Sequence, residues 1–293
     1  DGPLAAIDAI EQATGVKQIN LIGYCIGGTL TAATLAYLAS KRRANRIASI
    51  TYFATMVDFA DPGDLGVFID EPQIQKLEER MNEQGYLNGA DMATTFNMLR
   101  ANDLIWSFVI NNYLMGRTPH PFDLLYWNSD STRMPAAMHS YYLRKMYMEN
   151  KLVEPGGLTL DGVKIDLRKI KTPTFILSTR EDHIAPWKSA YSPSNNYAGD
   201  VTFVLSSSGH VAGVINPPGK SKYNYWTNDD LPADPEDWLT NATENPGSWW
   251  PHWDEWVEGF ADGDVPARIP GDGKLDALED APGSYVLARA IED

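Results

Sequence analysis

The chain has 293 residues, which suits one large domain or two smaller ones and allows a sizeable buried core. Hydrophobic residues make up 43% and charged residues 22%, the composition of an ordinary globular protein. The net charge of −15 argues against a nucleic-acid-binding protein, which needs a basic surface. It does not exclude an anionic small ligand, because local lysine or arginine side chains can override the overall sign.

Cys25 is the single cysteine, so no disulfide can form within the chain and nothing indicates an oxidising compartment. No apolar run approaches the roughly 20 residues that a transmembrane helix needs. The first residues carry no basic segment and no apolar signal-peptide core. The sequence therefore predicts a soluble, cytoplasmic protein without a membrane span.

The N-terminal part of the chain alternates between helical and strand patterns. We predict a helix over 2–14, a short and mostly buried strand over 16–23, a helix rich in alanine and leucine over 26–40, and a second strand over 46–55. This order is typical of a parallel α/β sheet.

Residues 58–150 differ, with helical segments, many large apolar groups and no convincing strand. Strand patterns return at 174–178 and 201–205. We therefore predict an α/β fold with a mostly parallel sheet, formed by residues 1–57 and 151–293, with residues 58–150 inserted as a helical cap.

The segment Gly23–Gly28 lies between the first predicted strand and the next helix. It fits the nucleophile elbow of α/β-hydrolase-type folds, glycine-x-nucleophile-x-glycine, with Cys25 in place of serine. We expect Gly23 and Gly27 to let strand and helix approach closely, and the helix N-terminus to favour a thiolate. The backbone N–H of Ile26 is the candidate oxyanion donor. This motif alone leaves a buried structural cysteine as the alternative.

An acid and a histidine follow the later predicted strands in the order that this fold requires. Asp182 comes shortly after the strand 174–178, and His210 shortly after 201–205. We predict that Cys25, Asp182 and His210 form a catalytic triad. Among the five histidines, His210 alone has both this position and a preceding glycine to let the loop turn.

The neighbours of Asp182 are less suited to the same role. Glu181 could compete with Asp182 as the acid, and His183 adjoins it, but neighbouring side chains at a strand end usually point apart. We interpret Glu181 and His183 as local structure or ligand contacts.

The sequence as a whole resembles polyhydroxyalkanoate synthases, and most of all the class I type, which uses short-chain monomers without a second subunit. The matches run in family order from residue 2 to about residue 253. The matching segments are Gly23–Thr29, Asp58–Asp61, Pro121–Asn128, Arg180–Ile184, Ser208–Pro218 and Gly247–Trp250.

The resemblance implies that 3-hydroxyacyl-CoA, in particular 3-hydroxybutyryl-CoA, is polymerised with release of CoA. Cys25 would hold the acyl group as a thioester and His210 would deprotonate it. Asp182 would help to activate the 3-hydroxyl, although the residues alone leave open whether it only orients His210. The resemblance also implies a homodimer at cytoplasmic polyester granules, with no metal and no cofactor besides the CoA of the substrate.

Few residues precede the first predicted strand, whereas this fold normally places strands before the one that carries the nucleophile. We therefore expect the C-terminal part of a longer protein, with an unpaired edge on the nucleophile strand. The loop that supplies a second oxyanion donor would also be absent. The sequence leaves open the monomer range, the CoA contacts and whether this chain is active alone.

Two other functions are compatible with these patterns. A thioesterase or polyester depolymerase would use the same triad to hydrolyse its substrate. A non-catalytic granule-binding or interaction module would use the tryptophan-rich segment 247–253 as a polymer- or partner-facing surface, although packing of that segment against the core is the simpler interpretation.

Overall fold

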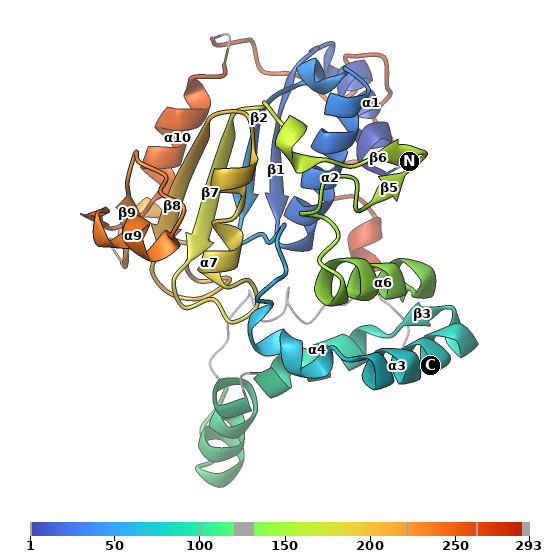
Figure 1. The fold of residues 1–293 in the computed structure, drawn as a ribbon, viewed down its shortest axis with the longest axis vertical. Coiled ribbons are helices and arrows are strands. Elements are labelled where there is room, and N and C mark those ends of the chain that lie inside the picture. The colour runs from blue at the N-terminus through green and yellow to red at the C-terminus, as the bar shows by residue number, and fades with distance from the viewer. Residues whose placement is uncertain (1, 100, 120–131, 221, 262, 289–293) are drawn as a thin grey trace. The chain divides into compact units, whose positions relative to one another are not determined.

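The computed structural model describes residues 2–99, 101–119, 132–220, 222–261 and 263–288 (Figure 1). The segment Pro121–Asn128, one of the motifs behind the family resemblance, lies outside the described residues. The chain divides into two compact units. The first holds the described residues of Asp1–Gly63 and Lys145–Ala277, and the second those of Asp64–Arg144 and Leu278–Asp293. The assignment of residues 58–150 as a cap stays a prediction.

The first unit is built on a sheet that has, among the described residues, six strands in the order β1-β2-β7-β8-β9-β10. The first four are parallel to one another, β9 runs antiparallel to β8, and β10 runs antiparallel to β9. This arrangement confirms the predicted mostly parallel α/β sheet. The strands are β1 (Ile19–Tyr24), β2 (Ile47–Phe53), β7 (Thr174–Thr179), β8 (Val201–Ser206), β9 (Asn224–Thr227) and β10 (Thr243–Pro246).

The strand β1 begins three residues later than predicted. Gly15 adopts a positive φ of 74° and ends the preceding helix, so the next residues serve as a link before the chain becomes extended at Ile19. Within the described residues β1 forms one edge of the sheet, as expected for the nucleophile strand, and Ile22 on it is 51% exposed.

The helices predicted over 2–14 and 26–40 are confirmed at those bounds. A two-stranded ribbon of β5 (Thr159–Leu160) and β6 (Val163–Lys164) also belongs to the first unit. The helices of this unit are α1 (Gly2–Thr14), α2 (Ile26–Ser40), α7 (Trp187–Ala190), α8 (Pro193–Asn196), α9 (Pro235–Thr240) and α10 (Trp250–Glu258).

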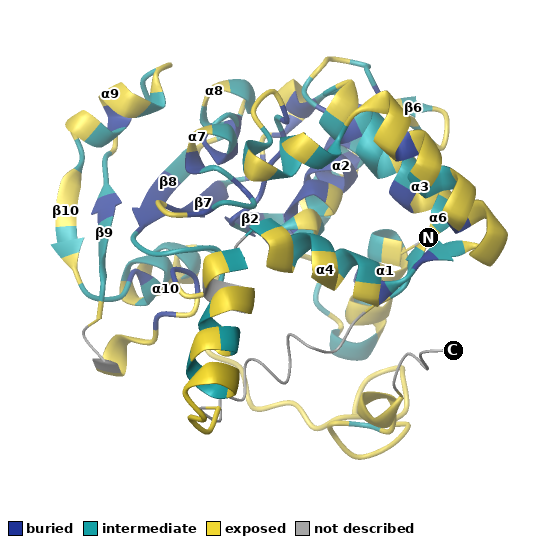
Figure 2. Cartoon of the chain, turned by 90° about the horizontal axis from the view of Figure 1, so that it is seen from below, coloured by how far each residue is buried: buried dark blue, intermediate teal, exposed yellow. Residues whose placement is uncertain are grey.

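The strands β7 and β8 lie at the centre of the core, and Figure 2 shows them almost entirely buried. The tryptophan-rich segment covers one face of this sheet. Trp253 Nε1 donates a hydrogen bond to Thr51 Oγ1 at 2.9 Å, and the Trp249 ring lies 5.2 Å from that of Phe53. Trp249 is only 2% exposed. Packing of this segment against the core is therefore confirmed.

The second unit consists mainly of short helices and π-helical turns. Its one described ribbon pairs two strands of two residues each, β3 with β4. No described helix of the chain is long and apolar enough to cross a membrane. The elements are α3 (Glu71–Gln84), β3 (Tyr86–Leu87), α4 (Gly89–Leu99), the π-helical turns Asn102–Trp106 and Val109–Leu114, β4 (Met134–Pro135) and α6 (Ala136–Tyr142).

An arginine at the end of this unit holds two carboxylates of α3. Arg144 Nε donates to Glu78 Oε1 at 2.7 Å, and its Nη1 donates to Glu71 Oε2 at 2.8 Å. The Ser140 hydroxyl also donates to Glu78. The hydrogen bond from Arg144, followed by that from Ser140, lowers the pKa of Glu78 from 4.5 to about 2.

The lowered pKa of Glu78 predicts that this side chain contributes to stability in a pH-dependent way. Because the folded-state pKa of Glu78 is depressed, its contribution is present above pH 4.5 and is lost as the pH falls toward about 2. Glu78→Gln should therefore lower the unfolding temperature at neutral pH, and the gap between variant and parent should close across that acidic window. Thermal unfolding against pH measures this gap, and a constant gap would contradict the assignment.

Candidate active site

Cys25 occupies the turn between β1 and α2. Its backbone has φ 54° and ψ −125°, a left-handed conformation that a residue with a side chain rarely adopts. The Cys25 N–H donates to Phe53 O of the neighbouring strand at 2.9 Å, and the Gly28 N–H donates to Cys25 O at 2.9 Å. This is the strained strand-to-helix turn that a nucleophile elbow requires.

The close approach of strand and helix depends on Gly23 and Gly28. A Cβ on Gly23 would lie 2.6 Å from Gly28 Cα, and a Cβ on Gly28 would lie 2.0 Å from Thr55 Oγ1. A Cβ on Gly27 would meet nothing within 4 Å. The expectation that Gly27 permits the approach was therefore wrong, because Gly28 is the residue of the helix that turns toward the strand.

The N–H of Ile26 belongs to the first turn of α2, where backbone amides have no acceptor within the helix. Such an amide beside Cys25 is suited to bind an anionic oxygen. The role of Ile26 as oxyanion donor stays a prediction.

Asp182 lies in the loop after β7, and its side chain has no exposed surface. The Asp182 Oδ1 accepts hydrogen bonds from the N–H groups of Ile184 and Ala185, each at 2.9 Å. The Oδ2 accepts one from Thr179 Oγ1 at 3.0 Å. These donors compensate the burial of a carboxylate and fix its orientation.

His210 lies in the loop after β8, and its Nδ1 is 2.7 Å from Asp182 Oδ2. Burial alone would lower the pKa of His210, but the hydrogen bonds to Asp182 and Cys25 and the charges of both raise it to about 10. Because Nδ1 faces the carboxylate, Nε2 is the nitrogen left to exchange a proton with the thiol. The elbow, acid and histidine that the sequence singled out therefore lie in one unit and interact.

The loop that carries His210 does not turn as the sequence suggested. Ser208, with φ 74°, adopts the left-handed conformation, whereas Gly209 does not. The close contact in this loop occurs at Gly213 instead, where a Cβ would lie 2.5 Å from Thr179 Cγ2.

Three aromatic residues that hold the His210 loop were missed as parts of the site. Trp249 Nε1 donates to Gly213 O, and Trp250 Nε1 donates to Val214 O, both at 3.0 Å. Tyr24 contacts His210 itself. The only sequence signal for Tyr24 was its place beside the nucleophile, and the tryptophans lie too far along the chain for spacing to reveal their partners.

The hydrogen bond to Asp182 Oδ2 involves His210 and none of the other described histidines. His139 belongs to α6 in the second unit, and the His252 ring of α10 lies 6.2 Å from that of Phe175. His183 follows Asp182 directly, yet it is His210 that bonds the carboxylate. The Glu181 N–H donates to Ser208 O at 2.9 Å, which is consistent with the local structural role expected of Glu181.

The motif at Asp58 has a structural role in the first unit. Asp58 Oδ1 accepts from Asn150 Nδ2 at 2.7 Å, and its Oδ2 accepts from Ser192 Oγ at 3.1 Å. The Asn150 Oδ1 in turn accepts from the Phe59 N–H at 2.8 Å. This network joins three separate segments of the chain.

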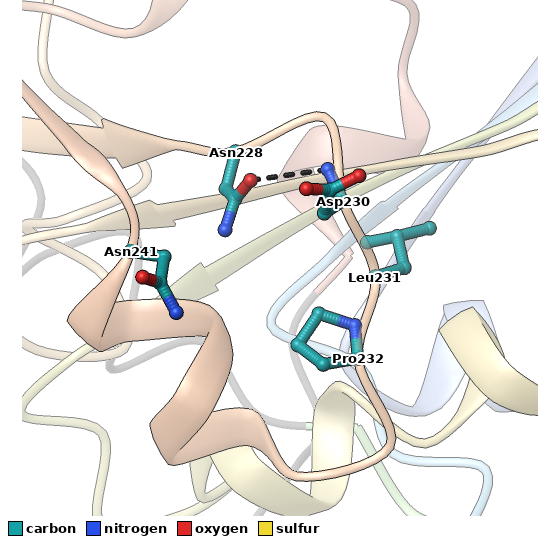
Figure 3. Close-up of a pocket in the computed structure, with 5 residues that line it drawn as sticks. All are labelled: Asn228, Asp230, Leu231, Pro232 and Asn241. Carbon is teal, nitrogen blue, oxygen red and sulfur yellow. Dashed lines mark hydrogen bonds between the residues drawn. The ribbon is translucent and has the colours of Figure 1, made fainter.

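A hollow near β9 and α9 does not belong to this site. Figure 3 shows the residues that line it, among which Asn228 Oδ1 accepts a hydrogen bond from the Asp230 N–H at 3.0 Å. None of the candidate catalytic residues lines it. Within the described residues no group of three or more histidine, cysteine, aspartate or glutamate side chains is arranged to hold a metal ion.

The chain is similar to known proteins over almost its whole length. A family model described as "alpha/beta hydrolase fold" matches residues 4–217. The poly(3-hydroxyalkanoate) polymerase subunit PhaC of Rhizobium meliloti (strain 1021) is 56% identical over 97% of this chain and 46% of the relative. The poly(3-hydroxyalkanoate) polymerase of Methylorubrum extorquens is 54% identical over 99% of this chain and 48% of the relative.

The chain spans about half the length of these curated relatives. These identities confirm the resemblance to polyhydroxyalkanoate synthases that the motifs indicated. Among solved structures, an esterase from Exiguobacterium antarcticum aligns with a TM-score of 0.40 and 16% identity, over 71% of this chain and 65% of the other.

The elbow offers a matched pair of glycine substitutions. Gly28→Ala should destabilise the protein by about 1–3 kcal/mol, because the added methyl group meets the buried Thr55 side chain. Gly27→Ala should be neutral or stabilising by up to about 1 kcal/mol, because the space is open and alanine favours helix. Denaturant unfolding of both variants checks this, and equal effects would contradict the packing described.

Proposed function

The chain belongs to the alpha/beta hydrolase fold family, and from that premise we propose that it carries the acyl-transfer site of a poly(3-hydroxyalkanoate) polymerase. The observation that carries the proposal is the 2.7 Å contact of His210 Nδ1 with the buried Asp182, beside an elbow that presents a thiol. The polymer product is carried over from the names of the relatives.

Acylation starts from the pair in which the proton of the Cys25 thiol lies on His210 Nε2, because the raised pKa of His210 favours the imidazolium. The thiolate attacks the carbonyl carbon of 3-hydroxyacyl-CoA, and the resulting oxyanion is stabilised by the N–H of Ile26. The carbon–sulfur bond to CoA then breaks, and His210 returns the proton to the leaving CoA sulfur. The products are an acyl-Cys25 thioester and free CoA. Exchange of one thioester for another is nearly balanced in energy, so a thiol suits this step better than a hydroxyl.

Chain growth requires the 3-hydroxyl of another monomer unit to attack the Cys25 thioester. His210, returned to its neutral form, is placed to accept that hydroxyl proton as it accepted the thiol proton. The new ester bond lengthens the polymer and releases the Cys25 thiol. Water in place of the hydroxyl would make the same site a thioesterase.

The surroundings of Asp182 support an orienting role. Both carboxylate oxygens already accept hydrogen bonds from the protein, and the side chain has no exposed surface where a substrate hydroxyl could bind. This differs from the direct activation of the 3-hydroxyl that the family resemblance favours. We propose that Asp182 holds Nδ1 of His210 and stabilises the imidazolium that forms in each transfer.

The remaining parts of the function follow from the same comparison. We propose 3-hydroxyacyl-CoA as the substrate class, with CoA as part of the substrate and no separate cofactor. The partners would be the growing polyester, the granule surface in the cytoplasm and a second copy of the protein. The monomer range and the residues that contact CoA are left open.

The reaction itself is tested with 3-hydroxybutyryl-CoA. We expect polymer and free CoA from the parent protein, and a loss of at least about 100-fold in polymer formation for Cys25→Ser, because the hydroxyl is far less acidic and its ester is a poorer acyl donor. Chromatography of the products checks both. Free 3-hydroxy acid without polymer would favour a hydrolase, and no turnover would favour a non-catalytic module.

The role of Asp182 is tested by rapid mixing of Asp182→Asn with the same substrate. If Asp182 orients His210, the initial burst of CoA release and the steady rate should fall together, because both steps use the same imidazole. A near-stoichiometric burst followed by a stalled steady rate would instead assign Asp182 to activation of the hydroxyl. Circular dichroism of the variant controls for folding.

A further inference from the structure

Tyr24 links the nucleophile turn to the loop of the base through its own backbone and side chain. It is the last residue of β1 and is bonded directly to Cys25. Its hydroxyl donates a hydrogen bond to the backbone oxygen of His210 at 2.7 Å. Its ring also stacks on the His210 imidazole, with centroids 5.4 Å apart and an interplanar angle of 29°. One side chain therefore holds both the backbone and the ring of the base.

The Tyr24 ring is itself fixed. It meets the ring of Phe53 edge-on at 6.4 Å, on the neighbouring strand β2. Phe53 O also accepts the hydrogen bond from the Cys25 N–H, so the same residue braces the nucleophile turn. Cys25 is therefore linked to His210 through a peptide bond, the Tyr24 ring and one hydrogen bond, and the ring is held by contacts to both Phe53 and His210.

The Tyr24 hydroxyl acts as a hydrogen-bond donor in this place. Burial, together with the nearby charges of Cys25 and Asp182, raises the pKa of the Tyr24 phenol above its usual value. The hydroxyl therefore stays protonated at physiological pH, and its proton is committed to the His210 carbonyl. An acid–base role for this phenol is not indicated.

We propose that Tyr24 is a positioning residue. It fixes the position of the His210 backbone through its hydroxyl and the plane of the His210 ring through stacking, so that Nε2 faces the Cys25 sulfur. Asp182 fixes the rotation of the same ring through Nδ1. The tryptophan bonds to Gly213 and Val214 anchor the loop farther along and do not reach the imidazole. The proposal rests on the proposed function, since it assigns Tyr24 to the same Cys25–His210 pair.

The test uses the fact that Cys25 is the only thiol of the chain. The rate of its alkylation by iodoacetamide across the neutral pH range reports how well His210 supports the thiolate, without any need for polymerase activity. Three variants are compared with the parent protein: Tyr24→Phe, which keeps the ring, Tyr24→Leu, which removes it, and His210→Ala. Tyr37→Phe is the matched control, because Tyr37 lies on α2 and the change deletes only its exposed hydrogen bond to Asp161, between β5 and β6.

We expect Tyr24→Phe to slow alkylation at about pH 7 by roughly 3- to 10-fold, the effect of losing one net hydrogen bond. Tyr24→Leu should slow it further and shift the pH profile toward that of His210→Ala, while Tyr37→Phe should match the parent. A purely structural role would lower the unfolding temperature of Tyr24→Phe and leave the pH profile unchanged, which would overturn the proposal.

The same data separate this proposal from the one on which it rests. If His210→Ala alkylates with the same pH profile as the parent, the Cys25–His210 pair and with it the proposed function are wrong. If His210→Ala changes the profile while both folded Tyr24 variants do not, the pair stands and the positioning role of Tyr24 is rejected.

Discussion

The candidate site depends on the buried carboxylate of Asp182, whose two oxygens both accept hydrogen bonds from the protein. A carboxylate without exposed surface is costly unless hydrogen bonds replace its water, and Asp182 has two backbone amides, a threonine hydroxyl and an imidazole. The first three come from the last residue of β7 and the loop that follows it, so the carboxylate is oriented by local bonds that do not depend on His210. His210 binds this carboxylate through Nδ1, which lies 2.7 Å from Asp182 Oδ2. That contact leaves Nε2 as the ring nitrogen that faces the thiol.

The parallel sheet brings the three groups to this contact. Cys25 follows β1, Asp182 follows β7 and His210 follows β8, and the carboxyl ends of parallel strands lie at the same edge of a sheet. The tryptophan-rich segment packs against one face of this sheet. Its Trp249 and Trp250 side chains donate hydrogen bonds to Gly213 O and Val214 O, which follow His210 in the chain. Burial of these large rings therefore stabilises the core and the loop that carries His210 together.

The sequence predicted the parts of this arrangement that depend on local patterns. Strand and helix periodicity located β1, α2, β7 and β8, and the order of nucleophile, acid and histidine came with the elbow motif. It misassigned the close contact to Gly27, because a glycine pair does not reveal which member turns inward. It also missed Tyr24, since a contact with a residue so far along the chain exists only once the sheet is assembled.

The most direct test of this account is the titration of the His210 ring by nuclear magnetic resonance. Because Asp182 and Cys25 favour the protonated imidazole, the ring should titrate far above 6.5, toward about 10, and Asp182→Asn should bring the midpoint down. A downfield Nδ1 proton that disappears in the Asn variant would accompany this result. A midpoint near 6.5 in the parent protein, unchanged by Asp182→Asn, would show that the buried carboxylate does not control the base and would contradict the account.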